Sequence, residues 1–583
     1  MKSRVLALCA VVSFLLVLAP SAFGATGSNE KDTFVQLLAI NDFHGNLLPP
    51  AGSSGRIAVG PPLTPGGPVQ TVDAGGVEYL STWIKSLRTT NPNTITVGAG
   101  DLIGASPLIS GLFHDEPTIE AMNAMGLDVT GVGNHEFDEG VAELLRMQFG
   151  NQLGGDGCNP ADGCQDGTPF GGSLFQYLAA NVFYEHTNDT IFPPYEIHKV
   201  GNAKIAFIGL TLEGTPLIVT PAGVAGLEFR AEVPVINDLV AQLRVEQGVR
   251  AFVVLIHQGG QQNAPFANGF MDSDRCDNLT GDIIPIVNGL SPQVDVVVSA
   301  HTHQPYICNI GGKLVTSASS FGRLITDIDL RIDHQTKDIE HTTARNVIVT
   351  RNVDKDPAET EIVNKYDALS GPIAHRVIGS ITSDITRTAN PAQESALGDV
   401  IADAQLASTS PTDFGGAVVA FMNPGGIRAD LTFANNDGGE DPGEITYNEM
   451  FTVQPFNNVM NVKTMTGDAI YRLLEQQFDN PSAGALRFLQ VSDGFTYTWS
   501  AAQPHGSHIV PGSVEINGVP ITLTGTYRVA MNNFLASGGD GFSVFNEGTD
   551  QLGGEIDIDA AVNYFLLNSP VSPGPQNRIT RIP

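Results

Sequence analysis

The sequence predicts an α/β fold, with a layered domain followed by a smaller α/β or α+β domain. Between residues 33 and 350, apolar runs repeatedly end in polar residues, as where TFVQLLAI runs into NDFHG and DVTGVG into NHEFD. Helix-like segments at 76–88, 117–125 and 235–247 lie between these runs. Buried strands alternating with helices are typical of sheets whose faces are covered by helices.

A polar segment with helical spacing, within residues 351–375, divides the chain and predicts a linker helix. Beyond it, LGDVIADAQLAS and GDAIYRLLEQQFD are expected to form amphipathic helices. GSVEINGVPITLTGTYRVAMN predicts a strand, turn and strand, with Asn-Gly as the hairpin signal. The predicted domains are 25–350 and 376–583, and a chain of 583 residues is long enough for more than one core.

The N-terminus has the features of a secretory signal peptide. Lys2 and Arg4 precede a mostly apolar run over 5–19, and SAFGA offers small residues for cleavage near residue 24. The run is short for a membrane span, although a retained anchor is the alternative, and no second span follows. We therefore expect residues 1–24 to be removed and the mature protein to be secreted, periplasmic or extracellular, without stable membrane insertion.

The chain is strongly acidic, with a formal net charge of -32 that removal of Lys2 and Arg4 would change to -34. A nucleic-acid polymer is an unfavourable partner for such a chain, because its phosphates are bound by basic surfaces. A small anionic substrate stays compatible with this charge where local cations or metals offset the field. No protein partner is predicted.

Four cysteines remain after residue 24, and an even number in an exported chain indicates disulfides. Three pairings are possible. The short Gly/Pro loop CNPADGC favours Cys158–Cys164, which leaves Cys276–Cys308. Four free or metal-binding thiols are the alternative, although no CxxC pair supports a zinc site.

Polar clusters follow five of the apolar runs. In D-x-H and H-x-H, two side chains point to the same side of an extended strand end. Their oxygen and nitrogen donors suit Zn, Mn, Fe, Co or Ni. One such cluster alone is more often a turn or a satisfied polar pair, but the joint pattern predicts a two-metal centre for phosphoester hydrolysis, in which the metals lower the pKa of a bound water toward about 7. The clusters are Asp42 with His44; Asp101; Asn134 with His135 and Asp138; His257; and His301 with His303.

The blocks NDFHG, GDLIGAS, GNHEFD, HQGG and AHTH resemble, in order and spacing, the calcineurin-like metallophosphoesterases. Nearly all of the mature chain resembles the exported 5'-nucleotidase branch, which includes UDP-sugar hydrolases and 2',3'-cyclic-nucleotide phosphodiesterases. This resemblance implies a four-layer αββα sandwich and a smaller C-terminal domain. It also implies two divalent metal ions (Zn, Mn, Co or similar), the first held by Asp42, His44, Asp101 and His303, the second by Asp101, Asn134, His257 and His301.

The same resemblance implies that His135 contacts the phosphate and stabilises the transition-state charge, while Asp138 orients it. Glu136 is expected to be solvated or to support the ligands. In the second domain, the loops MNPGGIRADL and NNFLASGGDGFSVF would be ordinary turns on the residues alone. The resemblance implies that they bind the nucleotide, with the base between Phe456 and Phe534 and polar contacts from Asn423, Arg428 and Asp540.

The chain departs from the family pattern at Gln393, where the family often has an Arg before the Glu-Ser pair. A lost guanidinium weakens bidentate phosphate binding, and Arg387, six residues earlier, is the candidate to compensate.

The implied function is hydrolysis of nucleoside 5'-monophosphates to nucleoside and phosphate by attack of metal-bound hydroxide. Alternatives with the same site are a 2',3'-cyclic-nucleotide phosphodiesterase/3'-nucleotidase and a UDP-sugar or nucleoside diphosphate hydrolase. A non-catalytic binding protein is opposed by the presence of every ligand position.

Overall fold

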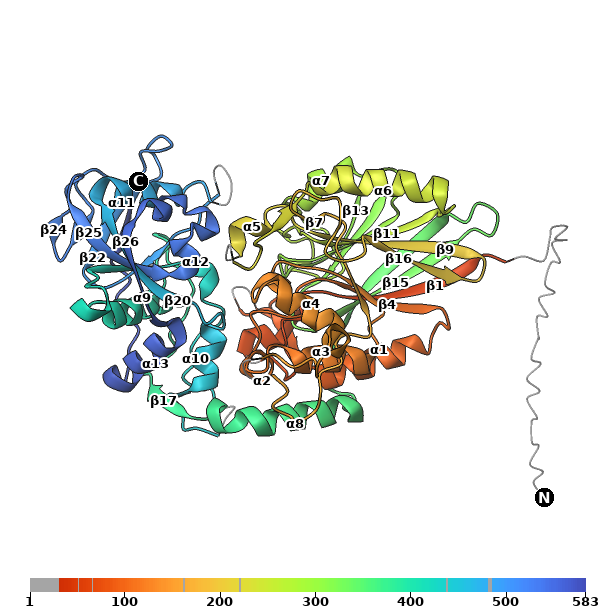
Figure 1. Ribbon diagram of the computed structural model, residues 1–583, viewed down its shortest axis with the longest axis horizontal. Helices are drawn as coiled ribbons and strands as arrows, with labels where there is room; N and C mark the ends of the chain where they lie inside the picture. The colour runs from red at the N-terminus through yellow and green to blue at the C-terminus, as the bar shows by residue number, and fades with distance from the viewer. Residues whose placement is uncertain are drawn as a thin grey trace, which may run out of the picture.

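The computed structural model forms two lobes that lie side by side (Figure 1). It describes residues 31–50, 52–64, 67–160, 163–219, 222–436, 439–480 and 485–583. The predicted signal peptide, residues 1–24, lies outside the described residues. The first lobe contains the five polar clusters, and the second contains the two glycine-rich loops.

Two six-stranded sheets form the centre of the first lobe. Strand β1 lies inside the first sheet, parallel to β4 and antiparallel to β15. The first sheet has the order β16 (Ile339–Ile348), β15 (Leu324–Ile332), β1 (Thr33–Ile40), β4 (Thr94–Ala99), β5 (Val129–Gly131), β6 (Gln176–Leu178). The second has the order β13 (Pro305–Ile310), β14 (Lys313–Ala318), β12 (Val296–Ser299), β11 (Ala251–His257), β9 (Ala203–Thr211), β8 (Tyr195–Val200).

The strands are apolar on both faces because each sheet packs against the other sheet on one face and against helices on the other. In β1, Val35, Leu37 and Ala39 pack between the sheets, whereas Leu38 and Ile40 pack in the core beneath the outer helices. One outer layer contains α1 (Val77–Arg88), α3 (Glu116–Met125) and α4 (Val141–Phe149), and the other contains α6 (Glu232–Glu246) and α7 (Ile283–Gly289). The four-layer αββα sandwich is therefore confirmed, and α1, α3 and α6 occupy the three segments predicted as helices. Smaller elements of this lobe are β2 (Arg56–Gly60), β3 (Gln70–Asp73), α2 (Leu108–Gly111), β7 (Val182–Tyr184), α5 (Thr215–Ile218) and β10 (Leu227–Phe229).

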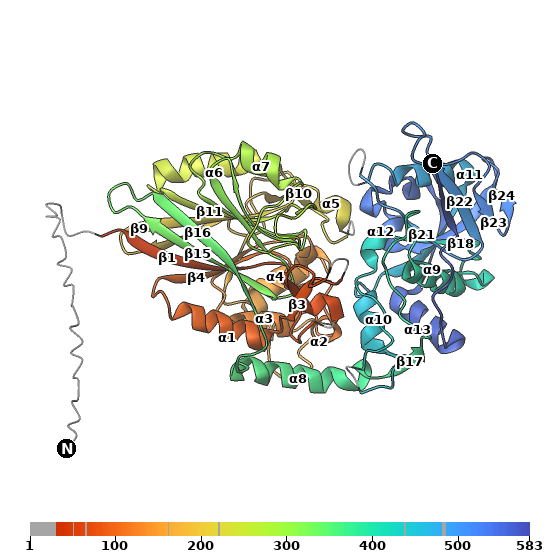
Figure 2. The same ribbon diagram turned by 180° about the vertical axis from the view of Figure 1, so that it is seen from behind.

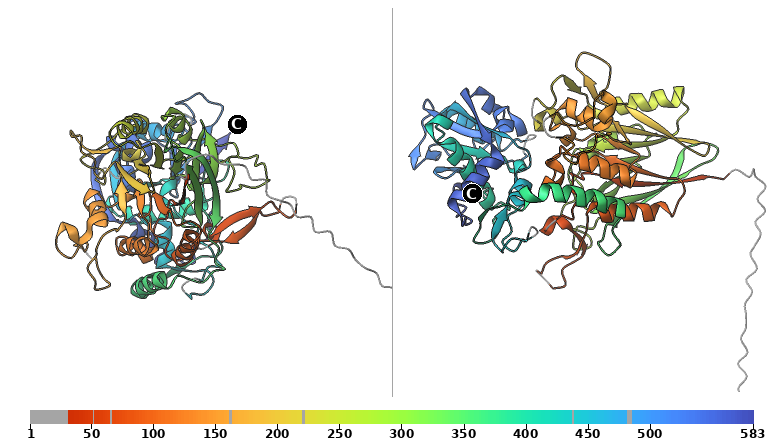
Figure 3. Two further views of the ribbon diagram at one scale, coloured as in Figure 1. Left: turned by 90° about the vertical axis from the view of Figure 1, so that its right-hand side faces the viewer. Right: turned by 60° about the horizontal axis from the view of Figure 1, so that its bottom comes forward.

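Helix α8 (Pro357–Ala374) leads from the first lobe to the second. It begins at Asp356, whose side chain accepts hydrogen bonds from the backbone N–H groups of Ala358 and Glu359, a common way to satisfy the first turn of a helix. Figures 1 and 2 show it along one side of the first lobe, and Figure 3 shows it from a further direction. The helix thus lies where the sequence predicts a linker helix.

The second lobe is built on a five-stranded sheet. It has the order β21 (Gln490–Val491), β18 (Val419–Met422), β25 (Thr526–Asn532), β20 (Val459–Thr466), β26 (Thr549–Ile556). A four-stranded sheet has the order β24 (Val519–Pro520), β23 (Glu515–Ile516), β22 (Phe495–Ser500), β27 (Ile579–Ile582), and β17 (Val377–Ser380) pairs with β19 (Glu444–Thr446). The helices are α9 (Ala396–Thr409), α10 (Tyr447–Val453), α11 (Gly467–Gln476), α12 (Asn533–Ala536) and α13 (Asp557–Asn568). Both predicted amphipathic helices are present as α9 and α11.

The predicted hairpin of this lobe is shorter than expected. Strands β23 and β24 pair across Asn517 and Gly518, which both have positive φ, 51° and 72°, as a two-residue type I′ turn requires. The following strand β25 leaves this unit and pairs with β18 and β20 in the larger sheet. The Asn-Gly signal therefore located the turn but not the partner of the next strand.

Two disulfides are present, Cys158–Cys164 and Cys276–Cys308, the pairing that the sequence favours. The first closes a loop of the first lobe, and the second ties residue 276 to strand β13. Within the described ranges, no helix combines the length and the apolar character needed to cross a membrane.

Candidate active site

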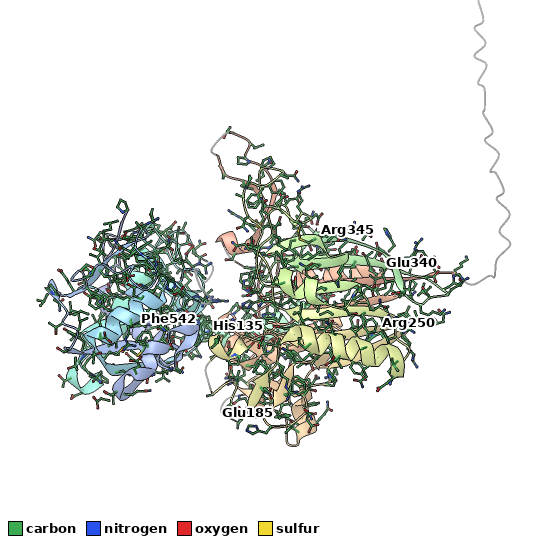
Figure 4. The ribbon with its side chains drawn as sticks, turned by 90° about the horizontal axis from the view of Figure 1, so that it is seen from above. His135, Glu185, Arg250, Glu340, Arg345 and Phe542 are labelled. Atoms are coloured by element: carbon green, nitrogen blue, oxygen red, sulfur yellow. A yellow bond between two sulfur atoms is a disulfide. The ribbon has the colours of Figure 1, made fainter. Side chains whose placement is uncertain are left out.

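The five polar clusters meet at one end of the first lobe. Strands β1, β4 and β5 run parallel in one sheet, and β11 and β12 run parallel in the other. Their carboxyl ends therefore open on the same side, which is where ligands bind in open α/β sheets. Figure 4 shows His135 at the face of this lobe that is turned toward the second lobe.

Asp42, His44 and His303 form the first group of candidate ligands, with ligand atoms within 4.8 Å of one another. The Nε2 atoms of His44 and His303 are only 3.0 Å apart, and Nε2 of His303 is 3.5 Å from Oδ1 of Asp42. His44 Nδ1 lies 2.8 Å from the Gly104 carbonyl oxygen, to which it donates, so its Nε2 holds a lone pair. Lone pairs that converge in this way fit a bound cation.

Asp101, His257 and His301 form the second group, also within 4.8 Å. Oδ2 of Asp101 lies 2.9 Å from His257 Nε2 and 3.6 Å from His44 Nε2, so this carboxylate stands between the two groups. His257 Nδ1 donates to the Ala99 carbonyl oxygen at 2.9 Å. Asn134 Oδ1 is one of the buried atoms of the described residues that have no hydrogen-bond partner, and such atoms usually have one.

The charges of the two groups also fit divalent metals. Burial lowers the pKa of His44 and of His301 to about 3, so both imidazoles are neutral and ready to coordinate at pH 7. Burial raises the pKa of Asp42 to about 7; the charge of His257 opposes this rise, and the neighbouring carboxylate of Asp101 adds to it. A cation between these groups would supply further positive charge. The donor set therefore fits divalent metal ions, and Asp101 lies between the two groups of candidate ligands.

Five of the candidate ligands have a left-handed backbone, which is uncommon outside glycine. Asp42 and His44 both have φ 48°, and Asp101 has φ 50°. His301 and His303 have φ 73° and 57°. Strain of this kind concentrates at functional sites, where the surrounding structure holds it in place.

Glu136 is buried and not solvated, which corrects one of the two expectations for it. Its Oε2 accepts hydrogen bonds from the backbone N–H groups of Gly133 at 2.6 Å and Asp101 at 2.9 Å, and its Oε1 accepts from Leu102 at 2.8 Å. It therefore joins the loop after β4 to the loop after β5. A Cβ at Gly133 would lie 2.1 Å from Asp101 Oδ1, so glycine is required where the two loops approach.

His135 and Asp138 form a hydrogen-bonded pair, with Nδ1 and Oδ2 2.8 Å apart. Burial alone would lower the pKa of His135, but the carboxylates of Asp138 and Asp101 raise it above its ordinary value. The His135 backbone N–H also donates to Asp101 Oδ1 at 2.9 Å. The His135 ring stacks on Phe456 of the second lobe, with centroids 5.7 Å apart and an interplanar angle of 17°.

A cavity of about 210 Å³ lies between the lobes beside this pair. The first lobe contributes Asn134, His135, Asp138, Ile218, Val219 and His301 to its wall. The second contributes Asn423, Gly425, Gly426, Arg428, Phe456, Asn458, Arg487, Asn532, Phe534 and Asp540. Five of the six substrate-binding residues expected from the sequence are in this wall.

Arg387 is the exception, and the structure places it outside the cavity. Its guanidinium donates to the carbonyl oxygens of Ile427, at 3.3 Å, and of Arg428, and its Nε lies 3.7 Å from Asp430 Oδ1. The expectation that it replaces a missing guanidinium at the substrate is therefore not supported. Arg387 supports the loop that carries Arg428 instead.

Sequence reasoning missed several residues of this wall, above all Arg487, which forms an ion pair with Asp540. The segment ALRFLQV has no glycine-rich or metal-binding pattern. One signal was available, because only three cations, Lys463, Arg472 and Arg487, occur between residues 429 and 527. Ile218 and Val219, next to the short helix α5, gave no signal.

Residues 35–305 match the family model for calcineurin-like phosphoesterases, and residues 377–547 match that for the 5'-nucleotidase C-terminal domain. The cell wall protein Lmo0130 of Listeria monocytogenes is 31% identical over 571 residues, which cover 93% of this chain and 68% of that protein. The chain belongs to the 5'-nucleotidase family of calcineurin-like phosphoesterases. As a member, it is a metal-dependent hydrolase.

Two further comparisons place this 5'-nucleotidase family member among its relatives. Endonuclease YhcR of Bacillus subtilis is 31% identical over 515 residues, and the match covers 87% of this chain but only 38% of that longer protein. The crystal structure of a 5'-nucleotidase precursor from Thermus thermophilus superposes with a TM-score of 0.73 at 24% identity, over 94% of this chain and 99% of that one. The last similarity shows the shared two-domain fold.

Proposed function

We propose that this phosphoesterase hydrolyses nucleoside 5'-monophosphates to nucleoside and inorganic phosphate. The observation that carries the proposal is the composition of the interdomain cavity. His135 and the candidate ligands Asn134 and His301 form one wall, and two phenyl rings and Arg428 stand in the other. A nucleotide has the matching parts, a phosphoryl group at one end and an aromatic base at the other.

In this proposal two divalent ions are held by the two ligand groups, with Asp101 shared. The first would have Asp42, His44, Asp101 and His303, and the second Asp101, Asn134, His257 and His301. When bound, such ions polarise the phosphoryl oxygens and make a bound water more acidic. The unpartnered Asn134 Oδ1 and the 2.9 Å approach of His257 Nε2 to Asp101 Oδ2 support this assignment.

His135 would stabilise the charge that develops on the phosphoryl group. Its Nδ1 is occupied by Asp138, so Nε2 is the nitrogen left to donate to a phosphoryl oxygen. The neighbouring carboxylates raise its pKa, and this favours the protonated ring that such a role requires. Asp138 keeps the ring oriented.

The second lobe would bind the rest of the nucleotide. Phe456 and Phe534 offer aromatic faces, and stacking on them tolerates every base. Arg428 is half-buried in the wall of this cavity, with its Cζ 5.7 Å from the centroid of the Phe456 ring. We expect it to contact the phosphoryl group, since desolvation lowers its pKa and an anion would stabilise its charge.

The proposal extends to processing and location. We place the mature N-terminus after residue 24, the metal domain at 25–350, the linker helix at 351–375 and the substrate-binding domain at 376–583. Two disulfides support export from the cytoplasm, since such bonds persist in oxidising compartments. One relative, moreover, is named a cell wall protein.

A substrate panel with metal analysis on the same sample tests the proposal. AMP, ADP, UDP-glucose, 2',3'-cyclic AMP and a single-stranded oligonucleotide are compared by phosphate release or product chromatography. We expect the highest kcat/KM for AMP and close to two metals per chain. Little AMP turnover beside strong cyclic-nucleotide turnover would overturn it, and metal-loaded protein that hydrolyses no phosphoester would indicate a binding protein.

A further inference from the structure

The polar groups expected to contact the nucleotide are largely occupied by one another. Asn532 Nδ2 donates to Asn423 Oδ1 at 3.1 Å, and Asn423 Nδ2 donates to Asp540 Oδ2 at 3.1 Å. All three residues are buried, with exposed fractions of 1%, 4% and 5% for Asn532, Asn423 and Asp540. Buried amides and carboxylates bonded in this way are held rigidly and have few free positions for a ligand.

The chain of hydrogen bonds ends at Arg487. Its Nη1 pairs with the remaining oxygen of Asp540, Oδ1, so both oxygens of that carboxylate are engaged. A guanidinium has five N–H donors in a fixed fork, and a carboxylate uses only part of them. Nη1 is the guanidinium nitrogen that the described contacts occupy, so Nε and Nη2 keep donors for a ligand in the cavity.

Arg487 and Arg428 line the same cavity as the candidate ligands Asn134 and His301. The two guanidinium groups share the second-lobe wall of one cavity. A phosphoryl group at the candidate ligands would therefore lie in a cavity that both guanidinium groups line.

The other candidates for a second guanidinium do not reach this place. Arg387 is bonded to the carbonyl oxygens of Ile427 and Arg428. Gln393, where the family often has an Arg, is not in the cavity wall, and its carbonyl oxygen accepts from Gln490 at 3.0 Å. Arg487 is left as the partner for Arg428.

We infer that Arg487 is a second phosphate-binding residue, whose Nε and Nη2 groups donate to the substrate phosphoryl group in the cavity that it shares with His301. Asp540 is then a positioning residue that holds the guanidinium, and Asn423 and Asn532 hold Asp540 in turn. This inference rests on the proposed function only in that a phosphoester occupies the cavity.

The test compares phosphate with adenosine on metal-loaded protein. Arg487→Gln is expected to weaken the binding of inorganic phosphate, measured by calorimetry, by about 10- to 100-fold, the usual loss for a charge-assisted hydrogen bond. KM for AMP rises by a similar factor while kcat changes less, and the inhibition constant of adenosine, which has no phosphoryl group, stays within about twofold. Arg487→Lys keeps the charge without the fork and should lie between.

Arg472→Gln is the matched control, because Arg472 forms surface ion pairs with Asp468 and Glu547 and is not in the cavity wall. Melting temperature and metal content, measured on each variant, verify that it is folded and loaded. Unchanged phosphate binding in Arg487→Gln overturns the inference, and so does weaker adenosine binding with unchanged phosphate binding, which would assign Arg487 to the ribose. Failure of the proposed function appears separately, as poor AMP turnover by the unmodified protein.

Discussion

The two walls of the cavity are built in different ways. In the first lobe the backbone sets the site, because the loops brace one another: Asp42 N–H donates to the Gly100 carbonyl oxygen at 3.1 Å, and His44 N–H donates to that of Asp101 at 3.0 Å. In the second lobe, side chains hold side chains, as in the series from Asn532 to Arg487. Backbone hydrogen bonds do not depend on which side chains are present, so single substitutions change the first-lobe wall little. The second-lobe wall is held by side chains, so single substitutions can change it. We therefore expect the chemistry to be less adjustable than the choice of substrate.

Replacing Asp101 should have the largest effect, because its carboxylate stands between both ligand groups. In Asp101→Asn, metal content should fall well below two per chain and kcat/KM by more than about 10³-fold. Metal analysis by mass spectrometry measures the first effect, with Asp138→Asn as the control that keeps its metals. Two metals per chain in Asp101→Asn would contradict a bridging role.

Replacing His135 separates chemistry from metal binding within the same wall. His135→Ala should lower kcat by about 10²-fold or more while both metals remain, because the ring stabilises charge without being a ligand. Rates and metal content are measured on one preparation. Loss of metal in this variant would move His135 into the ligand set.

Replacing Phe456 tests the second wall. Phe456→Leu should raise KM for AMP by roughly 5- to 150-fold, which corresponds to about 1–3 kcal/mol for one stacked base. Hydrolysis of p-nitrophenyl phosphate, which has no base, should change much less. Because the Phe456 ring stacks on His135, an equal loss of kcat for both substrates would show instead that Phe456 positions the catalytic ring.

The smallest effect concerns the helix that joins the lobes. Glu359 of α8 is fully buried near Lys85, Asp356 and Glu78, and burial raises its pKa from 4.5 to about 8. Between these two pH values the unfolded chain ionises this group while the folded chain keeps it protonated, so stability falls as pH rises. Glu359→Gln should make stability fall less as pH rises. Each kcal/mol of unfolding free energy that the variant retains should appear as about 2 °C in Tm.

Thermal unfolding of the unmodified protein and of Glu359→Gln at pH 5 and pH 8 measures this pH dependence of stability. Glu361→Gln on the same helix is a matched control. The Glu361 side chain is exposed, so this substitution removes no carboxyl group from the buried cluster. An identical decline in the Glu359 variant and the unmodified protein would show that another group carries the pH dependence.

The ligand groups were predictable because each is a local pattern at the end of a recognisable strand. D-x-H and H-x-H each bring two donors to one strand end, so Asp42, His44, His301 and His303 could be named as ligands before any fold was known. Their backbone is left-handed and not extended, and His301 and His303 join different ligand groups, so the motifs did not give the geometry. Glu136 was not predictable in this way, since its partners are backbone N–H groups that meet only when β4 and β5 pair. Arg487 lines the cavity and Arg387 does not, because their loops lie in different places. No periodic pattern in the sequence indicates where a loop lies relative to the other lobe.

The left-handed backbone at five ligand positions restricts which amino acids can evolve there. Asp and His are among the few side chains that tolerate this conformation, while most others cost about 1–2 kcal/mol at each position. A search for variants that prefer another metal would therefore begin from a narrow alphabet, since Glu or a β-branched residue at residue 42, 44 or 101 would first have to overcome the shape of the main chain. The backbone conformation of the loops therefore limits the possible ligands independently of the metal.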